Sequence, residues 1–173
     1  LVPETLKSTE GIRTTLYNVL DPVALCEVGA EKARSLGYEP VILSRYVEGE
    51  AKDVGTVVAG IANEIRLYNQ PWAVPCVLLM GGEVNVTVKG ARGKGGPNQE
   101  FVLGFAKALG AAEDVAAVAV DTDGNDGATD IAGGLVDGAT TRRALASGVN
   151  ISAALRDHDS SSALMALGDA VCT

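Results

Sequence analysis

Hydrophobic residues recur along the chain in two kinds of pattern, and each pattern predicts a different element. Apolar residues between positions 50 and 69 are spaced three and four apart, which is typical of a helix with one buried face. The same spacing, together with a capping residue such as Asp21 and a terminating glycine such as Gly37, predicts further helices. The predicted helices cover residues 22–36, 50–69, 98–109, 140–147, 152–156 and 160–167.

Short apolar runs lie between these helices and predict strands. The continuous runs are 41–43, 77–80 and 115–120, and residues 84–88 alternate between apolar and polar. Continuous runs are typical of strands that are covered on both faces, as in a parallel sheet. The sequence therefore predicts the α/β class: a layered, mainly parallel sheet with helices on both faces, in a single domain. We expect an extended lead-in over 1–17 and the domain over 18–173.

Charge and cysteine content narrow the class of protein. The 173 residues carry a net charge of −8, so a nucleic-acid-binding face is not expected. With 47% hydrophobic residues, the chain can bury a full core. The three cysteines show no CxxC spacing, which argues against a zinc site or a disulfide framework and favours a reducing cytoplasm. No apolar run approaches the roughly 18 residues of a membrane span, so no membrane partner is expected.

Glycine pairs mark the first candidate site. One pair follows the predicted strand 77–80 and the other precedes the predicted helix 98–109, so backbone N–H groups and the helix N-terminus could face an anion. Basic side chains in the same stretch could neutralise phosphate charge. The residues predicted to bind phosphate are Gly81, Gly82, Arg92, Lys94, Gly95 and Gly96. A glycine-rich hairpin with solvated basic residues is the alternative, because the spacing is not that of a P-loop.

Carboxylates gather in a second stretch, directly after the predicted strand 115–120. The acidic residues are Asp121, Asp123, Asp126 and Asp130. So many like charges repel unless a cation compensates, and carboxylates at a strand end can bind Mg²⁺ or orient a hydroxyl group. Capping of turns by aspartate is the structural alternative. Since ligands bind beyond the carboxyl ends of strands in open α/β sheets, both stretches are predicted to face one cleft.

Other polar residues have both a structural and a functional interpretation. Asn98 could cap its own helix and Glu100 could interact with the helix dipole, or both could point into the cleft. Glu83 is either a ligand or base, or the partner in a local hydrogen bond. His158, the single histidine, stands between aspartates, which is typical of a solvated side chain. A histidine-dependent triad would lack its GxSxG serine.

The two stretches together resemble a known family. The sequences GGEVNVTVKGARGKGGPNQE (81–100) and DTDGNDG (121–127) are similar to the motifs of the C-terminal, or MOFRL, domain of class II glycerate 2-kinases. Members of that family also carry the name hydroxypyruvate reductase and are associated with tartrate degradation. The similarity covers about residues 18–173. Many members have Arg where this chain has Pro97, so a phosphate contact from that position would pass to Arg92 or Lys94, or would be dispensed with.

The resemblance implies a reaction and a set of roles. It implies an α/β domain that faces a larger N-terminal α/β domain across the active site, with this chain as the C-terminal part. The reaction would transfer the γ-phosphoryl group of ATP to the 2-hydroxyl of D-glycerate, with Mg²⁺. The glycine pairs with Arg92 and Lys94 would hold nucleotide phosphates. The roles of the other residues would be orientation of glycerate by Glu83 and Asn98, metal binding by Asp121, Asp123 and Asp126, and catalysis by Glu83, Asn98 and Asp121.

Two other hypotheses stay open on the sequence alone. An NAD(P)H-dependent hydroxypyruvate reductase is one, although no GxGxxG fingerprint follows any predicted strand. A non-catalytic domain that binds a small anion or docks a partner is the other. The oligomeric state, including a homo-oligomer, is not predicted.

Overall fold

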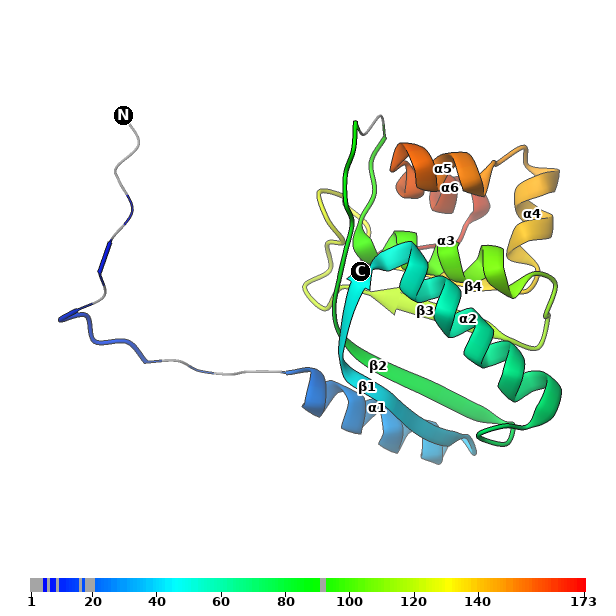
Figure 1. The fold of residues 1–173 in the computed structure, drawn as a ribbon, viewed down its shortest axis with the longest axis horizontal. Helices are drawn as coiled ribbons and strands as arrows, with labels where there is room; N and C mark the ends of the chain where they lie inside the picture. Colours follow the sequence, from blue (N-terminus) through cyan, green and yellow to red (C-terminus); the bar gives the residue numbers. More distant parts are fainter. Residues whose placement is uncertain (1–4, 6, 9, 16, 18–20, 91–92) are drawn as a thin grey trace.

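Helices and strands alternate along the chain, as the hydrophobic pattern predicts (Figure 1). The structure is a computed structural model that describes residues 5, 7, 8, 10–15, 17, 21–90 and 93–173. The helices are α1 (Pro22–Ser35), α2 (Ala51–Tyr68), α3 (Pro97–Leu109), α4 (Thr140–Ala146), α5 (Ile151–Asp157) and α6 (Ser160–Leu167). The strands are β1 (Glu39–Glu50), β2 (Cys76–Asn85), β3 (Ala116–Val120), β4 (Gly133–Asp137) and β5 (Ala170–Val171). The described residues before α1 form neither helix nor strand and extend away from the rest of the chain.

Local capping chemistry sets the ends of the first helices. The Asp21 carboxylate accepts the N–H of Ala24 at 2.7 Å, and Pro22 takes the first helical position, where no N–H is needed. At the other end of α2, Asn69 adopts the left-handed conformation and its N–H bonds the carbonyl of Ile65. The predicted helices are confirmed, with no end shifted by more than one residue.

The first sheet is a parallel pair, β1 with β2. Both strands are longer than their apolar runs predict: β1 continues to Glu50 and β2 continues through Gly81 and Gly82 to Asn85. The small residues on the buried side of α1, Cys26 and Ala30 among them, let that helix lie close on one face of the pair. Helix α2 lies on the other side (Figure 1). The α/β class and the parallel pairing of these two strands are confirmed.

The second sheet departs from the prediction of one mainly parallel sheet. Strand β3 pairs antiparallel with β4, and β4 pairs antiparallel with β5. The connection 121–132 contains no helix, and a parallel return needs a crossover of that kind. Helix α3 covers one face of this sheet, whereas Val118, Val120 and Leu135 on its other side are 59%, 42% and 48% exposed. This second sheet is therefore covered by a helix on one face, whereas the first sheet has a helix on each face.

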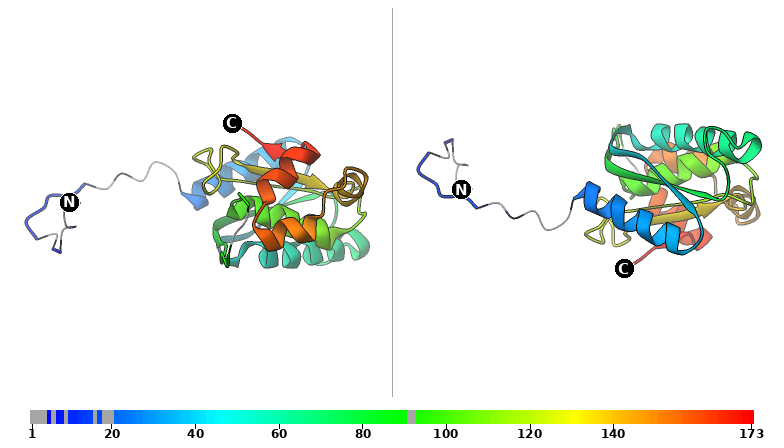
Figure 2. Two further views of the ribbon diagram at one scale, coloured as in Figure 1. Left: turned by 90° about the horizontal axis from the view of Figure 1, so that it is seen from above. Right: turned by 90° about the horizontal axis from the view of Figure 1, so that it is seen from below.

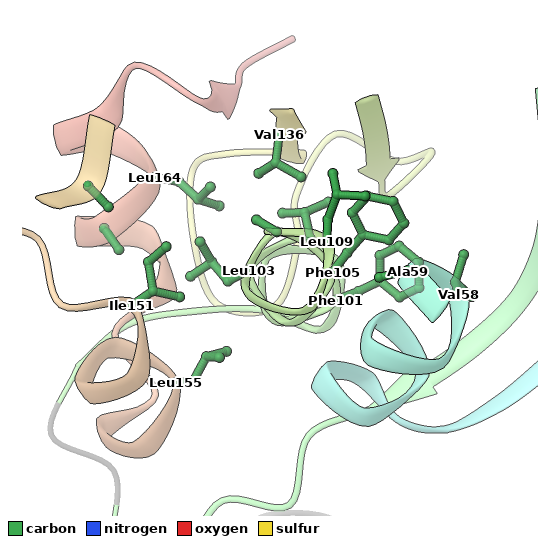
Figure 3. Close-up of a cluster of buried hydrophobic side chains, with 14 of the residues drawn as sticks. Val58, Ala59, Phe101, Leu103, Phe105, Leu109, Val136, Ile151, Leu155 and Leu164 are labelled. Atoms are coloured by element: carbon green, nitrogen blue, oxygen red, sulfur yellow. The ribbon is translucent and has the colours of Figure 1, made fainter. Parts of the chain in front are cut away.

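Helix α3 is the centre of the hydrophobic core (Figure 3). Its residues are apolar nearly all round, which is typical of a helix surrounded by protein. Phe101 and Phe105 point towards Val58 and Ala59 of α2, while Leu103 points towards the C-terminal helices. Figure 2 shows α2 along one edge of the body and the C-terminus of the chain at the opposite edge. The polar residues at the start of α3 are carried into this buried setting with the rest of the helix.

Glycines allow α2 and α3 to lie in close contact. A Cβ at Gly55 of α2 would overlap the backbone of Phe101 and Phe105, and a Cβ at Gly104 of α3 would overlap the backbone of Lys52. Gly60, also in α2, faces open space. The close packing of α2 against α3 therefore depends on the absence of a side chain at Gly55 and at Gly104.

Among the described residues, no helix is long and apolar enough to cross a membrane.

Candidate active site

The first glycine pair lies inside strand β2, so the predicted loop after residues 77–80 is wrong. Gly82 pairs with Val47 of β1, and Glu83 pairs with Glu48. A Cβ at Gly82 would overlap the backbone of Val47, and its φ of 141° is one that side chains rarely allow. Both glycines therefore allow other parts of the same chain to approach the backbone of β2 closely.

The second glycine cluster packs against two other segments of the chain. A Cβ at Gly93 would overlap the Asp159 side chain, and one at Gly95 would meet the hydroxyl of Ser160. A Cβ at Gly96 would overlap Asp126. Because these glycines have no side chains, the segments 126–127 and 157–161, which are distant in the sequence, can pack against this part of the chain.

Hydrogen bonds fasten this loop, residues 93–96, to the end of α5 and the start of α6. The N–H of Gly93 donates to the carbonyl of Asp157 at 3.1 Å, and the N–H of Lys94 donates to the Asp159 carboxylate at 3.2 Å. In return, the N–H of Ser161 donates to the carbonyl of Lys94 at 3.0 Å. The backbone of the loop is therefore held in one place, whereas the side chain of Lys94 is exposed.

Asp126 occupies the N-terminus of α3, where a helix binds an anion. Its carboxylate accepts the N–H groups of Asn98 at 3.1 Å and Gln99 at 2.9 Å, and the side-chain amide of Asn98 at 3.0 Å. The next N–H, from Glu100, bonds the carbonyl of Gly96 at 3.0 Å. Asp126 is fully buried, so it acts as the cap that a glycine at the capping position cannot provide. These three N–H groups of α3 already have partners.

Gln99 joins the same three segments through its side chain. Its amide nitrogen donates to the carbonyl of Asp126 at 3.2 Å and to the Thr129 hydroxyl at 3.0 Å. Its amide oxygen accepts the hydroxyl of Ser161 at 2.6 Å. Gln99 is fully buried, and both ends of its amide have partners, as a buried amide requires.

Glu100 and His158 form a buried pair on the side of α3 that faces α5. The Glu100 Oε1 lies 2.8 Å from the His158 Nδ1, and the two side chains are 1% and 9% exposed. The other oxygen, Oε2, is buried and has no hydrogen-bond partner in the described part of the chain. His158 ends α5 in the left-handed conformation, with φ of 54°. The solvated interpretation of His158 is therefore wrong, whereas Glu100 lies in the first turn of α3, as a dipole partner would.

A cavity of about 340 Å³ lies where these segments meet. Its lining comes from residues 83–86 and Val88, from the glycine loop with Pro97, from Gly127, and from Glu100 with His158. The Glu50 carboxylate supports one wall, because it accepts the N–H of Thr87 at 3.1 Å. Burial raises the pKa of Glu50, but hydrogen bonds from Thr87 and Lys52 outweigh burial and lower it. The cavity thus unites Glu83, Gly95 and Gly96 of the first predicted stretch with a pair that was not predicted.

Comparisons with known proteins decide the family. Residues 76–173, more than half of the chain, match the family described as MOFRL. The chain belongs to the MOFRL family. Glycerate 2-kinase of Pyrococcus horikoshii is 42% identical over 148 residues, which are 86% of this chain and 33% of that protein. D-glycerate 2-kinase of Thermotoga maritima is 35% identical over 173 residues, which are 100% of this chain and 41% of that protein.

Other relatives of this MOFRL chain carry a second name or have solved structures. An Agrobacterium vitis protein named "Putative hydroxypyruvate reductase" is 42% identical over 156 residues, 90% of this chain and 36% of its own. The crystal structure of the T. maritima glycerate kinase superposes with a TM-score of 0.86 at 35% identity, covering 88% of this chain and 37% of that one. A P. horikoshii crystal structure gives a TM-score of 0.86 at 39% identity, covering 90% and 35%. This chain spans well under half the length of these relatives.

The acidic stretch of the MOFRL chain forms a set of turns after β3. Asp121 is half-buried and its N–H bonds the carbonyl of Ala132 at 2.7 Å, while the Asp123 carboxylate accepts the N–H of Asn125 at 2.9 Å. Neither aspartate lines the cavity that Glu83 shares with the glycine loop. In the described part of the chain, no three His, Cys, Asp or Glu side chains converge where they could hold a metal ion. A metal in this stretch would need ligands from elsewhere.

The remaining predicted residues of the MOFRL motif fall into different settings. Arg92 lies outside the described residues. Asn98 is half-buried and uses its amide nitrogen to bond Asp126, and Pro97 takes the first position of α3, where Pro is favoured. The signal that could have revealed the Glu100–His158 pair is the composition of α3. A helix that is apolar all round is buried, so a carboxylate on it needs a partner.

Proposed function

We propose that this chain is the C-terminal domain of an ATP-dependent D-glycerate 2-kinase that forms 2-phosphoglycerate. The observation that carries the proposal is the cavity where the two family motifs meet, because it presents carboxylate, imidazole and glycine backbone together. The relatives named glycerate 2-kinase support the reaction, since they match 86% and 100% of the chain. The chain covers 33% and 41% of those relatives, so we place the complete active site between this domain and the N-terminal domain of the same protein.

In this proposal the cavity holds the acceptor. Glu83 is exposed and lines the cavity, so its carboxylate is available to a glycerate hydroxyl. The Asn98 amide nitrogen is engaged by Asp126, which leaves the carbonyl end of its side chain for the substrate. Nucleotide phosphates would lie against the loop of Gly95 and Gly96, near the exposed Lys94. Gly81 and Gly82 would contribute through strand β2, and Arg92 would contribute through its charge.

Magnesium fits the acidic stretch only in part. Asp121 and Asp123 reach the surface, whereas Asp126 is buried and gives its oxygens to α3. Mg²⁺ commonly takes one or two protein carboxylates and completes its shell with water and phosphate oxygens. We therefore assign Mg²⁺ to Asp121 and Asp123, where it would neutralise charge on the transferred group, and assign Asp126 to the structure of the site.

A coupled assay tests the proposed reaction and its position. The intact protein that carries this chain is incubated with ATP, Mg²⁺ and D-glycerate, and product is converted by enolase, which accepts 2-phosphoglycerate. A signal that appears with enolase alone supports the proposal. A signal that also requires phosphoglycerate mutase would show that the 3-hydroxyl is phosphorylated instead. If no ATP-dependent product forms with either enzyme, the kinase proposal is rejected. The 173-residue chain alone is expected to give no turnover.

Hydroxypyruvate reduction is the second candidate, because the A. vitis relative carries that name. The same purified protein is mixed with hydroxypyruvate and NADH or NADPH, and loss of the reduced nicotinamide is followed. We expect no oxidation above the rate without enzyme. Turnover that matches or exceeds the kinase rate would favour the reductase. A domain that only binds an anion or docks a partner would give neither activity in the intact protein.

A further inference from the structure

Among the described residues, the Glu100–His158 pair is the one buried ionisable pair that lines the cavity. Glu100 comes from the first turn of α3 and His158 from the end of α5, 58 positions later, so the fold itself brings them together. Both side chains line the cavity, although the Glu100 carboxylate is only 1% exposed. A carboxylate buried to this degree is costly unless a partner compensates its charge. His158 supplies that compensation from one side only.

The backbone at His158 ends helix α5 in the left-handed conformation, and neighbouring segments hold it there. Its φ of 54° and ψ of 40° are left-handed, a region that glycine and asparagine adopt more readily than histidine. Residues held in such conformations by their surroundings are frequent at functional sites. Here the surroundings are the loop 93–96, which bonds to Asp157 and Asp159 on either side of His158. The imidazole is therefore fixed between the glycine loop and α3.

The hydrogen bond to Glu100 decides which ring nitrogen is free. With an ionised Glu100, the proton of the neutral ring must sit on Nδ1, because Oε1 lies 2.8 Å away and accepts it. The other nitrogen, Nε2, then carries the lone pair. Glu100 also stabilises positive charge on the ring, since its Oε2 has no other donor within the described structure. An imidazole held in this way by a carboxylate is suited to accept a proton at Nε2.

We infer that His158 is the base for the acceptor hydroxyl of the substrate and that Glu100 positions it; this inference rests on the proposed kinase function. The hydroxyl oxygen forms a bond to the γ-phosphorus of the nucleoside triphosphate, and the bond from that phosphorus to the β–γ bridging oxygen breaks. The hydroxyl proton passes to Nε2 of His158, and the nucleoside diphosphate leaves with the electron pair of the broken bond. The resulting imidazolium is stabilised by Glu100. Glu83 lines the same cavity and would contact the substrate beside this base.

The first test needs no substrate, because the chain contains one histidine. In ¹⁵N-labelled protein, the two imidazole nitrogen shifts report protonation and tautomer directly. We expect the neutral ring to carry its proton on Nδ1. In Glu100→Gln, the side-chain amide can donate to Nδ1, so the proton should move to Nε2. A neutral wild-type ring that carries its proton on Nε2 would overturn the inference.

The second test uses kinetics of the intact protein. His158→Asn keeps a residue that tolerates the left-handed conformation but lacks the imidazole. Loss of a general base lowers kcat by about 10²–10⁴-fold, and we expect this range with little change in KM. The acidic limb of the kcat profile should also disappear. The charged groups near His158 are Glu100, which bonds its ring, Glu83, which lines the same cavity, and the flanking Asp157 and Asp159, and all remain in the variant.

The outcomes separate this inference from the proposed function. If the wild type forms no phosphoglycerate, the kinase proposal and the transfer step fail together, while the nitrogen shifts still decide whether Nε2 is a free base. If the wild type is active and His158→Asn retains kcat within about threefold with its acidic limb intact, the base assignment is rejected. Urea unfolding of both variants serves as the control for folding. Activity that falls while the tautomer of Glu100→Gln stays unchanged contradicts the positioning role.

Discussion

The role of Asp126 separates a metal ligand from a helix cap, and a single substitution distinguishes them. In Asp126→Asn the shape of the side chain is kept, but one carboxylate oxygen becomes an NH₂ group. In the wild type, the backbone N–H and the side-chain amide of Asn98 both donate to Oδ1 of Asp126. The oxygen that remains in the variant can still accept both. The NH₂ group must then face the N–H of Gln99, which bonds Oδ2 at 2.9 Å in the wild type. One buried donor thus loses its acceptor and meets another donor.

The magnitude follows from the contacts that change. A hydrogen bond to a charged group contributes about 1.5–3 kcal/mol, and the loss of negative charge at a partly buried helix N-terminus costs up to about 2 kcal/mol more. Because these effects overlap, we expect Asp126→Asn to lower the free energy of unfolding by about 2–4 kcal/mol. With a urea m-value of about 2 kcal/mol/M, the unfolding midpoint should fall by about 1–2 M.

Urea unfolding of the 173-residue chain, followed by circular dichroism, measures this shift. Asp130→Asn is the matched control, since Asp130 is exposed in the same loop and its replacement should change stability by less than about 0.5 kcal/mol. Each titration is repeated with Mg²⁺, which stabilises a native state that binds it. A variant as stable as the wild type would refute the cap. If Mg²⁺ in addition raised the midpoint of the wild type but not of the variant, Asp126 would be a metal ligand.

Other substitutions test the packing and the electrostatics. Gly55→Ala should destabilise the chain by about 1–3 kcal/mol, because its Cβ would overlap α3. Gly60→Ala in the same helix should stabilise the chain by about 0.5–1 kcal/mol. Thermal melts in which both variants shifted the melting temperature in the same direction would contradict this. Burial raises the pKa of Asp137, but the Arg143 guanidinium outweighs burial and lowers it. The stability from this ion pair should therefore be complete above the ordinary aspartate pKa and vanish as the pH falls through the lowered value. Urea midpoints across that range should show a shallower acid slope in Asp137→Asn, and an unchanged slope would argue against the pair.

The elements that the sequence predicts well are those with local causes. Helix α1 begins at Pro22 because the Asp21 side chain, three residues before Ala24, accepts the N–H of Ala24, and both residues can be read directly from the sequence. Strand β4 was not predicted, because Gly133 and Gly134 interrupt its apolar pattern. The structure explains these glycines by distant neighbours: a Cβ at Gly133 would overlap the backbone of β3, and one at Gly134 would meet the side chain of Leu164. A single sequence does not show such contacts.

The site follows the same division. The stretch 81–100 is rich in glycine, and glycine alone does not reveal whether such a stretch exposes its backbone to a ligand or allows another segment of the protein to pack against it. Gly96 faces Asp126, and Gly82 lies in a strand against Val47. Likewise, the partner of Glu100 is 58 positions away and depends on the packing of α3 against α5. Long-range partners decide which polar residues face the cavity.

The motif residues therefore divide by what they contact, and this division has an experimental consequence. Asp126 and Gln99 bond protein on every side, so their replacement should reduce stability and activity together. Glu83 faces the cavity and is exposed, so its replacement should reduce activity while the unfolding midpoint stays close to that of the wild type. His158 also faces the cavity, but it compensates the buried Glu100, so its replacement should lower the unfolding midpoint as well as the activity. A family motif of this length is then the sum of two requirements. One set of residues holds three distant segments together, and the other set lines the cavity that those segments enclose.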